Sequence, residues 1–379
     1  MSESEIYVTR PFLPPLREVL PYLERIWESR VVTNRGPILE EFEEAVGAHL
    51  GVDHISIFTN GTMALLTALR SLELSGEVIT TPFSFVATSH CLIWNGLKPV
   101  FVDIEPTTLN LDPRRIEAAI TPRTTAILAV HCYGRSCDTG AIREIADKHG
   151  LAVIYDAAHA FGTRDEGGSI LRHGDLSVMS FHATKIFNTF EGGAIVCPDA
   201  VSKERLDQMK DFGFTNEVEV VATGINGKMS EFNAALGLCQ LKHMDRVMEG
   251  RKRVNDTYIA LLSGVPGLQC LNTLDEPGFN HAYFPILVGD EYPLGRDELY
   301  QALKDNGIHP RRYFHPLIPQ FPMYRDLPSG NAANLPVATD AARRLLCLPI
   351  YPELELAQVE RICGLVAAPQ SFLNLYDLR

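Results

Sequence analysis

One lysine in this sequence has surroundings that favour covalent chemistry, because it lies between two apolar, strand-like runs. Lys185 ends the segment Val-Met-Ser-Phe-His-Ala-Thr-Lys (178–185) and precedes Glu-Gly-Gly at 191–193. Lysine amines form Schiff bases with carbonyl groups, and desolvation lowers the lysine pKa enough to supply free amine. A lysine in an exposed loop is the alternative, which the small and polar neighbours Ser180 and Thr184 disfavour.

A carboxylate follows an apolar run in the segment Ala-Val-Ile-Tyr-Asp (152–156). Four apolar residues in a row predict a buried parallel strand, so we expect Asp156 at its carboxyl end, where open α/β sheets bind ligands. The carboxylate could cap a helix or pair with a buried cation, and a protonated pyridine nitrogen is such a cation. Taken alone, the segment favours both roles equally.

A possible phosphate site precedes a helix near the start of the chain. The strand-like run 54–58 leads into Asn-Gly-Thr (60–62) and then into an alanine- and leucine-rich helix. N–H groups at a helix N-terminus carry partial positive charge and suit a phosphate dianion, and the Thr62 hydroxyl can add a donor. A plain helix cap is the alternative, and for this segment alone it is the better supported one.

Strand-like runs alternate with helical stretches through the first part of the chain, which predicts a mostly parallel sheet covered on both faces. Two further runs flank Lys185 and could form a hairpin-like excursion on the same sheet. Hydrophobic periodicity also predicts amphipathic helices and one long helix. The strands are expected at 54–58, 77–80, 99–102, 125–130, 151–155, 176–181 and 193–197, and the helices at 14–30, after Pro37 and at about 230–258.

The length of 379 residues exceeds what one hydrophobic core supports, so two domains are expected. Prolines become frequent after about residue 266 and punctuate shorter elements, including a strand at 282–288 and a helix at 296–306. We therefore predict a large domain over 1–249, with an N-terminal helical segment, and a smaller C-terminal α/β domain over 250–379.

Charge and composition exclude several classes of protein. The formal net charge of −13 disfavours nucleic acid and anionic membrane as partners. The eight cysteines show no Cys-x-x-Cys spacing, so neither a metal site nor a redox pair is expected. The N-terminus has no basic, then apolar, signal segment, and no run of about 18 apolar residues occurs. A cytoplasmic location is the resulting expectation.

The order of phosphate turn, acid and lysine is what a pyridoxal phosphate site on a doubly wound sheet needs. With these features the chain resembles the DegT/DnrJ/EryC1/StrS family of sugar aminotransferases, which have the aspartate aminotransferase-like (type I) fold. The resemblance extends over nearly the whole length. The matching blocks are Gly-Pro with two glutamates (36–41), Asn-Gly-Thr (60–62), Thr-Pro-Phe-Ser-Phe-Val-Ala-Thr (81–88), Asp-Ala-Ala-His-Ala (156–160), Ser-Phe-His-Ala-Thr-Lys (180–185), Glu-Gly-Gly (191–193) and Asn-Gly-Lys-Met-Ser-Glu-Phe-Asn-Ala-Ala-Leu-Gly (226–237).

The resemblance implies a role for each matching position. Lys185 would hold pyridoxal 5'-phosphate as a Schiff base and then move protons between cofactor and substrate carbon. Asp156 would pair with the pyridine nitrogen, Phe85 would stack on the ring, and His159 would lie near its phenolic oxygen. The phosphate would be bound by Gly61, Thr62 and Ser180. Asn226 would reach the phosphate in a neighbouring subunit, which implies a homodimer with shared active sites.

Several of these residues have a simpler structural interpretation. Phe85 could belong to the core, and His159 could be a buried histidine with satisfied hydrogen bonds. Ser180 could cap a turn, and Asn226 beside glycine is chiefly a turn signal. In the C-terminal part, a proline-flanked loop carries Arg311, Arg312, Tyr313 and His315. Arg312, Tyr313 and His315 are candidates for binding the sugar or its diphosphate, and an exposed basic loop is an equally supported interpretation.

The details of the resemblance bear on the substrate. The run Ile-Phe-Asn-Thr-Phe after Lys185, the glycine at 227 and the N-terminal Pro-Pro-Leu-Arg-Glu-Val-Leu-Pro-Tyr-Leu-Glu are most similar to family members that aminate dTDP-4-keto-6-deoxy-D-glucose at C4. The expected reaction is a ping-pong transamination with L-glutamate as amino donor and dTDP-4-amino-4,6-dideoxy-D-glucose as product. Close relatives aminate C3 of a dTDP-3-keto-6-deoxyhexose or use UDP-sugars, so these remain alternatives.

Other classes are less well supported. A sugar dehydratase of the same fold carries histidine in place of the Schiff-base lysine, and here the position is Lys185. An NAD-dependent dehydrogenase would need a Gly-x-Gly-x-x-Gly after an early strand, which is missing. A non-catalytic regulator that binds pyridoxal phosphate would be expected to have lost the lysine or the acid, and both are present.

Overall fold

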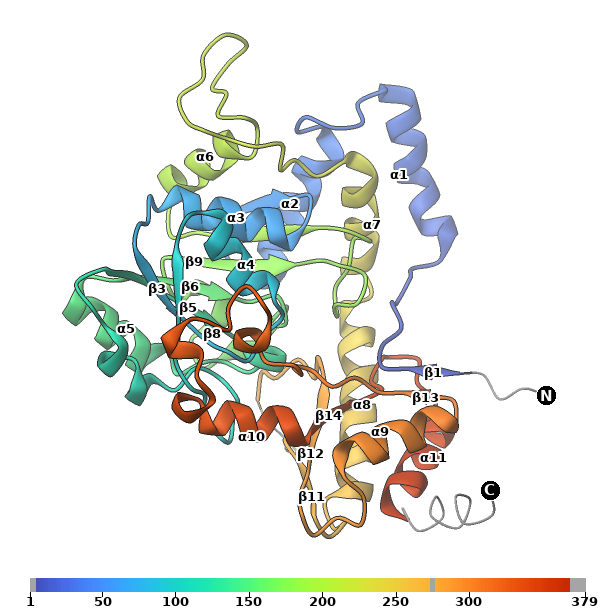
Figure 1. The fold of residues 1–379 in the computed structure, drawn as a ribbon. Helices are drawn as coiled ribbons and strands as arrows, with labels where there is room; N and C mark the ends of the chain where they lie inside the picture. Colours follow the sequence, from blue (N-terminus) through green and yellow to red (C-terminus); the bar gives the residue numbers. More distant parts are fainter. Residues whose placement is uncertain (1–4, 273–276, 369–379) are drawn as a thin grey trace.

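The structure, a computed structural model, describes residues 5–272 and 277–368, and its centre is a seven-stranded sheet (Figure 1). The strand order is β2-β10-β9-β6-β5-β3-β4. All neighbours pair in parallel except β10, which runs antiparallel to β2 and β9. The strands are β2 (Ile55–Phe58), β3 (Glu77–Thr80), β4 (Lys98–Phe101), β5 (Thr124–Val130), β6 (Ala152–Asp156), β9 (Leu176–Ser180) and β10 (Gly193–Val196).

The predicted strands and the predicted excursion around Lys185 agree with this sheet. Strands β9 and β10 are joined by residues 181–192, and Gly193 pairs with Ser180 in an antiparallel ladder. Because the chain turns back at this point, the connection that carries Lys185 leaves and re-enters the sheet at the same edge of the strands. The predicted mostly parallel α/β fold is confirmed.

Neighbouring residues of each strand enter different cores, as the alternation of side chains in a strand requires. Phe58, Val178 and Ile195 pack under α3 and α4, whereas Ile57 and Met179 pack under α2 and α7. Helix α5 covers the same face as α2 and α7 farther along the sheet. These helices are α2 (Pro37–Leu50), α3 (Gly61–Ser71), α4 (Ala87–Trp94), α5 (Thr139–His149), α6 (Ala200–Met209), which contacts α3, and α7 (Glu231–Leu241).

The N-terminal helices were predicted correctly, and one buried carboxylate fixes the second of them. Helix α1 spans Leu16–Ser29, and α2 begins at Pro37. Glu231, at the start of α7, accepts hydrogen bonds from the N–H groups of Ile38 (2.8 Å) and Leu39 (2.9 Å). A Cβ at Gly36 would lie 2.6 Å from the Glu231 carboxyl carbon, so only glycine allows this approach.

The long helix expected at about 230–258 is in fact two helices. Helix α7 ends at Leu241, and α8 runs from Met244 to Leu262. His243 leaves the helical conformation (φ −113°, ψ 4°) and its Nε2 lies 2.8 Å from Glu18 Oε2 of α1. No glycine or proline marks this break, so periodicity alone could not place it.

The C-terminal part is built on a three-stranded antiparallel sheet in the order β11-β12-β14. The N-terminal strand β1 (Ile6–Tyr7) pairs in parallel with β13 (Ile308–His309) beside it. The elements are β11 (Leu268–Cys270), β12 (Phe284–Val288), β14 (Leu345–Leu348), α9 (Arg296–Asp305), α10 (Pro336–Arg344) and α11 (Leu356–Ala367), with a small hairpin of β7 (Arg164–Asp165) and β8 (Gly168–Ser169) on the other part. The predicted domain boundary at 249/250 falls within α8 and stays a prediction.

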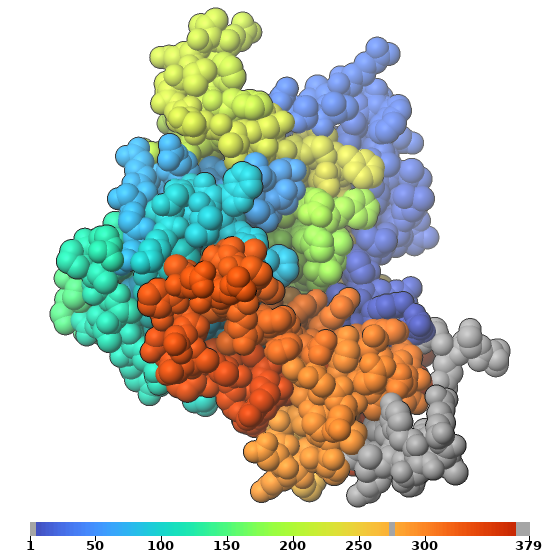
Figure 2. Space-filling view, viewed as in Figure 1, coloured from blue at the N-terminus to red at the C-terminus, as the bar shows by residue number. Residues whose placement is uncertain are grey.

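The segment between α6 and α7 projects from the rest of the molecule (Figure 1), and the space-filling view shows it standing clear of the surface around it (Figure 2). Within the described residues, no helix has the length and apolar character needed to cross a membrane. The same residues contain no group of three or more His, Cys, Asp or Glu side chains that could hold a metal ion.

Candidate active site

A cavity of about 590 Å³ lies at the carboxyl ends of β2, β6 and β9. This is the edge at which parallel sheets bind ligands, because the strands end there and the following turns begin. Both parts of the molecule contribute to its wall. The lining residues used below are Gly61, Thr62, Ser84, Phe85, Asp156, His159, Ser180, His182, Lys185, Glu191, Tyr283, Tyr313 and Phe314.

The predicted phosphate turn forms the start of α3. Asn60 caps the helix, its Oδ1 accepting a hydrogen bond from the N–H of Met63 at 2.8 Å. The N–H groups of Gly61 and Thr62 have no partner within the described residues, as expected in the first turn of a helix. A Cβ at Gly61 would lie 2.8 Å from the Ser180 Cβ, so glycine lets Ser180 close the cradle. Gly61, Thr62 and Ser180 are therefore brought together as predicted.

The carboxylate of Asp156 lies at the end of β6 and is buried. Its Oδ1 accepts a hydrogen bond from the N–H of Ala158 (3.1 Å), and its Oδ2 accepts one from Thr88 Oγ1 (2.8 Å). Burial raises the pKa of Asp156, while Thr88, Ala158 and the Lys185 amine act in the opposite direction. The carboxylate is held in one orientation at the cavity wall.

Lys185 lines the same cavity from the connection between β9 and β10, where its side chain is half-buried. Desolvation lowers the pKa of the amine to about 8, although the charge of Asp156 acts to raise it. At pH 7 about a tenth of such amines are neutral, against about one in three thousand for a lysine with pKa 10.5. The lysine that the sequence singled out is therefore placed to act as a nucleophile.

His159 is buried in a group of aromatic rings, with Phe314 stacked on it at 6.0 Å between ring centroids. Its Nδ1 accepts a hydrogen bond from the N–H of Tyr133 at 3.2 Å. Burial lowers the pKa of His159 well below its ordinary value, so the ring is neutral. Because Nδ1 is an acceptor, the ring hydrogen resides on Nε2, which can donate to an oxygen in the cavity.

Phe85 is 61% exposed and borders the cavity, so it is not a core residue. Contiguous exposed apolar patches, more than single residues, mark surfaces that a ligand or a protein covers. Trp94, on the helix that follows, is 81% exposed on the same side. The predicted stacking role of Phe85 is compatible with this position and stays a prediction.

One of the three predicted substrate residues reaches the cavity. Tyr313 lines it. Arg312 instead pairs with Asp297 at 2.7 Å and lies over the ring of Tyr300, 4.4 Å from its centroid. His315 is exposed and lies outside the lining residues. The adjacent Tyr313 and Phe314 both line the cavity, whereas their neighbours Arg312 and His315 do not, and the sequence pattern could not reveal this.

Asn226 does not line the cavity of its own chain but is exposed and forms a β-bridge with Asp211, at the base of the projecting segment. The next residue joins this base to the phosphate turn, because Gly227 O accepts a hydrogen bond from the Thr59 N–H at 2.7 Å. Gly227 N–H in turn donates to Lys210 O at 2.8 Å. A role for Asn226 at a cofactor phosphate would thus require a second chain.

Several residues of the site leave no clear signal in the sequence. Tyr283 and Phe314 form part of the cavity wall, and Thr88 holds Asp156. Thr88 ends the block 81–88 that was noted for its resemblance, but its contact lies 68 residues away in the chain. Tyr133 was hidden because it acts through its backbone N–H.

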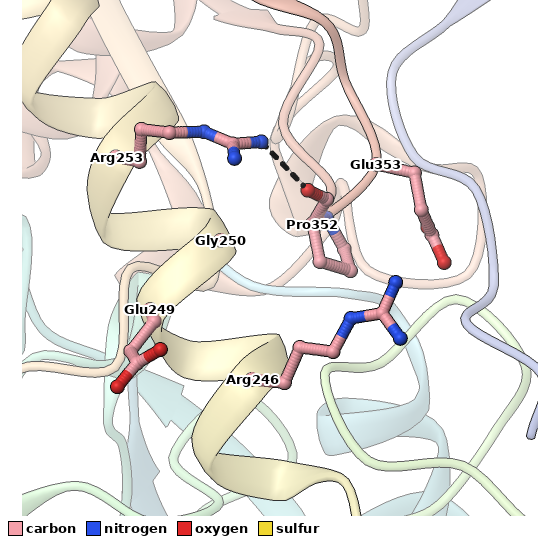
Figure 3. Close-up of a pocket in the computed structure, with 6 residues that line it drawn as sticks. All are labelled: Arg246, Glu249, Gly250, Arg253, Pro352 and Glu353. Atoms are coloured by element: carbon pink, nitrogen blue, oxygen red, sulfur yellow. Dashed lines mark hydrogen bonds between the residues drawn. The ribbon is translucent and has the colours of Figure 1, made fainter.

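Another hollow, of about 410 Å³, lies between α8 and the loop after β14 (Figure 3). Its two arginines and two glutamates balance in charge, and Arg253 donates a hydrogen bond to Pro352 O at 3.1 Å. A Cβ at Gly250 would lie 2.9 Å from Pro352, so the helix and the loop are in close contact there. The lining residues are Arg246, Glu249, Gly250, Arg253, Pro352 and Glu353. Because it has neither a phosphate cradle nor a nucleophile, we assign this hollow no catalytic role.

Comparison with known proteins places this site in context. Residues 17–367 match the DegT/DnrJ/EryC1/StrS aminotransferase family. The chain is 53% identical to a dTDP-4-amino-4,6-dideoxy-D-glucose transaminase of Shigella dysenteriae, over 96% of this chain and 99% of the relative. It is 50% identical to one from Escherichia coli, over 97% and 99%. The crystal structure of DesI in the presence of its TDP-sugar product superposes with a TM-score of 0.92, at 35% identity over 99% of this chain and 96% of that one.

Proposed function

The chain belongs to the DegT/DnrJ/EryC1/StrS aminotransferase family, and on this basis we propose that it transfers the amino group of L-glutamate to C4 of dTDP-4-keto-6-deoxy-D-glucose. The product would be dTDP-4-amino-4,6-dideoxy-D-glucose. The family, the fold class, the transaminase activity and the pyridoxal phosphate cofactor predicted from the sequence are confirmed. A cytoplasmic location stays a prediction.

The observation that carries the substrate assignment is the identity of half or more to two C4 transaminases over almost the entire chain. Identity that extends over the full length covers both the cofactor cradle and the C-terminal loop that borders the cavity. Orientation of the sugar over the cofactor decides which carbon is aminated, and both of these regions would set that orientation.

The residues present fit pyridoxal phosphate. Gly61, Thr62 and Ser180 form a cradle that a side chain at position 61 would fill, and two unpartnered N–H groups suit a phosphate. Asp156 supplies a buried carboxylate for the pyridine nitrogen, and the Nε2–H of His159 suits the phenolic oxygen. When bound, pyridoxal phosphate supplies a ring that accepts electrons from the substrate carbon.

Lys185 then has two tasks that follow from its surroundings. Its amine, kept partly neutral by desolvation, can attach to an aldehyde carbon. Lys185 Nζ would also be the group that accepts a proton from the substrate carbon and returns it. The stacked and tilted rings of His159, Tyr283 and Phe314 form a largely apolar wall on one side of the cavity.

A homodimer with shared sites completes the proposal. No arginine occurs among the described lining residues, although the phosphate, glutamate and the diphosphate are all anionic. A third hollow, of about 790 Å³, adjoins the active-site cavity. It shares Thr62 and Phe85 with that cavity and includes the exposed Trp94. Exposed apolar residues also mark the projecting segment, namely Phe212, Phe214, Val218, Val220 and Val221. Such patches mark protein interfaces, and we infer that a second copy covers them and brings its Asn226 to the phosphate.

The oligomeric state is measured by light scattering coupled to gel filtration. The expected result is a dimer, and Asn226→Ala should weaken pyridoxal phosphate binding about 10-fold, as expected for loss of one hydrogen bond to a charged group. A monomer with full affinity for the cofactor would contradict shared sites.

Two alternatives remain to be distinguished by experiment. A C3 transaminase acting on a dTDP-3-keto-6-deoxyhexose would use the same cofactor machinery with the sugar turned over the ring. A regulator that binds the cofactor without turnover would keep the cradle, but the retained pair of Lys185 and Asp156 disfavours it.

The test is to incubate the holoenzyme with L-glutamate and, separately, the 3-keto and 4-keto dTDP-sugars, and to locate the new amine by NMR. The proposal predicts amination at C4 with stoichiometric 2-oxoglutarate. Amination at C3 would overturn the substrate assignment. If neither sugar led to 2-oxoglutarate, the proposed transamination of these sugars would be wrong.

A further inference from the structure

The carboxylate of Asp156 has a fixed donor on each of its oxygens. One donor is the backbone N–H of Ala158 on Oδ1, and the other is the Thr88 hydroxyl on Oδ2. The first would form in any sequence with this turn, whereas the second depends on a side chain from another element. Thr88 belongs to α4, which covers the sheet beside β6.

The direction of the hydrogen bonds around Thr88 can be deduced. Ser84 Oγ lies 2.8 Å from Thr88 Oγ1, and geometry alone allows either to be the donor. An ionised carboxylate only accepts hydrogen bonds, so the one hydroxyl hydrogen of Thr88 is directed to Asp156. Ser84 must then donate to Thr88. The order is Ser84 to Thr88 to Asp156, with Ser84 at the cavity wall.

This use of a threonine departs from the ordinary one in a helix. A helical threonine commonly returns its hydroxyl to the carbonyl four residues earlier. Thr67 donates to Met63 O at 2.8 Å, and Thr257 donates to Arg253 O at 2.9 Å. Thr88 is fully buried in the first turn of α4, where the residue four positions earlier lies outside the helix, and its hydroxyl reaches a carboxylate at the end of a strand.

The electrostatic consequence has a definite sign. Burial raises the pKa of Asp156, and the Thr88 hydroxyl is the strongest of the groups that oppose this. A proton shared between a pyridine nitrogen and this carboxylate resides on the nitrogen only while the carboxylate is the weaker base. Loss of the hydroxyl would make the carboxylate more basic and would shift the balance of such a proton toward Asp156.

We propose that Thr88, oriented by Ser84, is a positioning residue that keeps Asp156 ionised and directed at the cofactor, so that the shared proton stays on the pyridine nitrogen. A protonated ring is the stronger electron acceptor. The inference rests on the cofactor assigned to this cavity and is independent of which sugar carbon is aminated.

The test compares Thr88→Val, which keeps the shape and removes the hydroxyl, with Thr88→Ser, which keeps the hydroxyl. The matched control is Thr80→Val, since Thr80 is equally buried but donates to Leu128 O at 2.8 Å and has no contact with Asp156. Each protein is loaded with pyridoxal phosphate labelled with ¹⁵N in the ring, and the chemical shift of that nitrogen is measured at neutral pH. The rate of the half-reaction with glutamate is recorded alongside.

The expected result is a shift of the ¹⁵N signal toward that of neutral pyridine in Thr88→Val, with a half-reaction slower by about 10- to 100-fold, the size of a lost hydrogen bond to a charged group. Thr88→Ser and Thr80→Val should keep the pyridinium signal. A Thr88→Val protein that binds the cofactor and keeps both signal and rate would overturn the proposal.

If Thr88→Val does not fold, Ser84→Ala carries the test. This variant removes the donor to Thr88 and should move the ¹⁵N signal in the same direction by a smaller amount. An unchanged ¹⁵N signal in Ser84→Ala would overturn the proposed role of Ser84 in orienting the Thr88 hydroxyl. Failure of every variant and of the wild type to bind pyridoxal phosphate would instead contradict the cofactor assignment, so the two failures are distinguishable.

Discussion

Two clusters in this molecule bury lysine beside carboxylate, and they arrange their charges in opposite ways. Under α6, Lys210 Nζ lies 2.6 Å from Asp207 Oδ1, and Lys203 Nζ lies 2.7 Å from Oδ2. In the cavity, Asp156 is held by neutral hydroxyl and amide donors, and no ion pair joins it directly to Lys185 in the described residues.

The pKa values follow this difference. Burial by itself would raise the pKa of Asp207, but Lys210, Lys203 and Ser56 outweigh it and hold it at about 2. Burial lowers the pKa of Lys185 to about 8 and raises that of Asp156. Direct pairing keeps both groups charged. Separation by neutral donors leaves an amine and a carboxylate whose protonation a ligand can change, which is the property that catalysis uses.

The largest effect on turnover should come from removing Lys185, the lysine that lines the cavity. Lys185→Ala is expected to lower the rate of 2-oxoglutarate formation at least about 1,000-fold, because Lys185 is the one lysine among the described residues that line the cavity. Thermal stability of the apoprotein should be nearly unchanged, since the amine makes no ion pair. Turnover of Lys185→Ala within 10-fold of wild type would show that the cavity lysine has no special role in catalysis.

Removing the paired lysine should have the opposite profile. Lys210→Ala leaves Asp207 buried with two remaining cations, Lys203 and Arg35, and we expect the free energy of unfolding to fall by about 3 kcal/mol, at the low end for a broken buried pair because these two cations remain. Denaturant unfolding measures this change. The control is turnover per folded molecule, which should stay near that of wild type. A loss of turnover without a loss of stability in Lys210→Ala would mean that Lys210 serves catalysis and not the fold.

Neutralising the cavity carboxylate should have an intermediate effect. Asp156→Asn keeps the size and the hydrogen-bond acceptor but cannot hold a proton on the ring nitrogen, so the half-reaction with glutamate should slow on the order of 100-fold. Stopped-flow absorbance of the bound cofactor gives the rate. Asp207→Asn is the matched comparison and should lower stability instead; a half-reaction slowed as much in Asp207→Asn would refute the contrast.

The smallest effect concerns pH. Only the neutral amine attaches to an aldehyde, so the rate at which the apoprotein incorporates pyridoxal phosphate should rise with pH to a midpoint of about 8. Asp156 raises the pKa of Lys185, so this midpoint should move to lower pH in Asp156→Asn. A midpoint that stays in place would show that the two groups are not coupled.

The paired cluster gives the complementary pH dependence. The folded pKa of Asp207, at about 2, lies below its ordinary value of 3.8, so its contribution to stability is complete above pH 4 and is lost as the pH falls toward 2. Acid unfolding of Lys210→Ala compared with wild type measures this contribution. Equal acid midpoints in the two proteins would mean that the pair does not stabilise the fold.

The sequence predicted the strands, their mostly parallel order and the site lysine, because each leaves a local signal. Four apolar residues before Asp156 and the turn at Gly61 are such signals, and the family resemblance added the cofactor. The break at His243 and the direction of Arg312 left none, since both depend on partners, Glu18 and Asp297, that lie elsewhere in the chain.

The contrast between Lys185 and Lys210 was also beyond the sequence. Lys185 follows strand β9, and Lys210 follows helix α6. Only the structure shows that Lys185 faces a cavity and that Lys210 faces an aspartate. Thr88 illustrates the same limit, because its role follows from a hydrogen bond across the sheet edge and not from its place in the block 81–88.

The most direct test of the difference between the two lysines is chemical. The apoprotein is loaded with pyridoxal phosphate, reduced with borohydride and digested, and the peptides are analysed by mass spectrometry. We expect one phosphopyridoxyl group per chain, on Lys185, and none on Lys210 or Lys203. Labelling of another lysine, or no labelling of a protein that has bound the cofactor, would contradict this expectation.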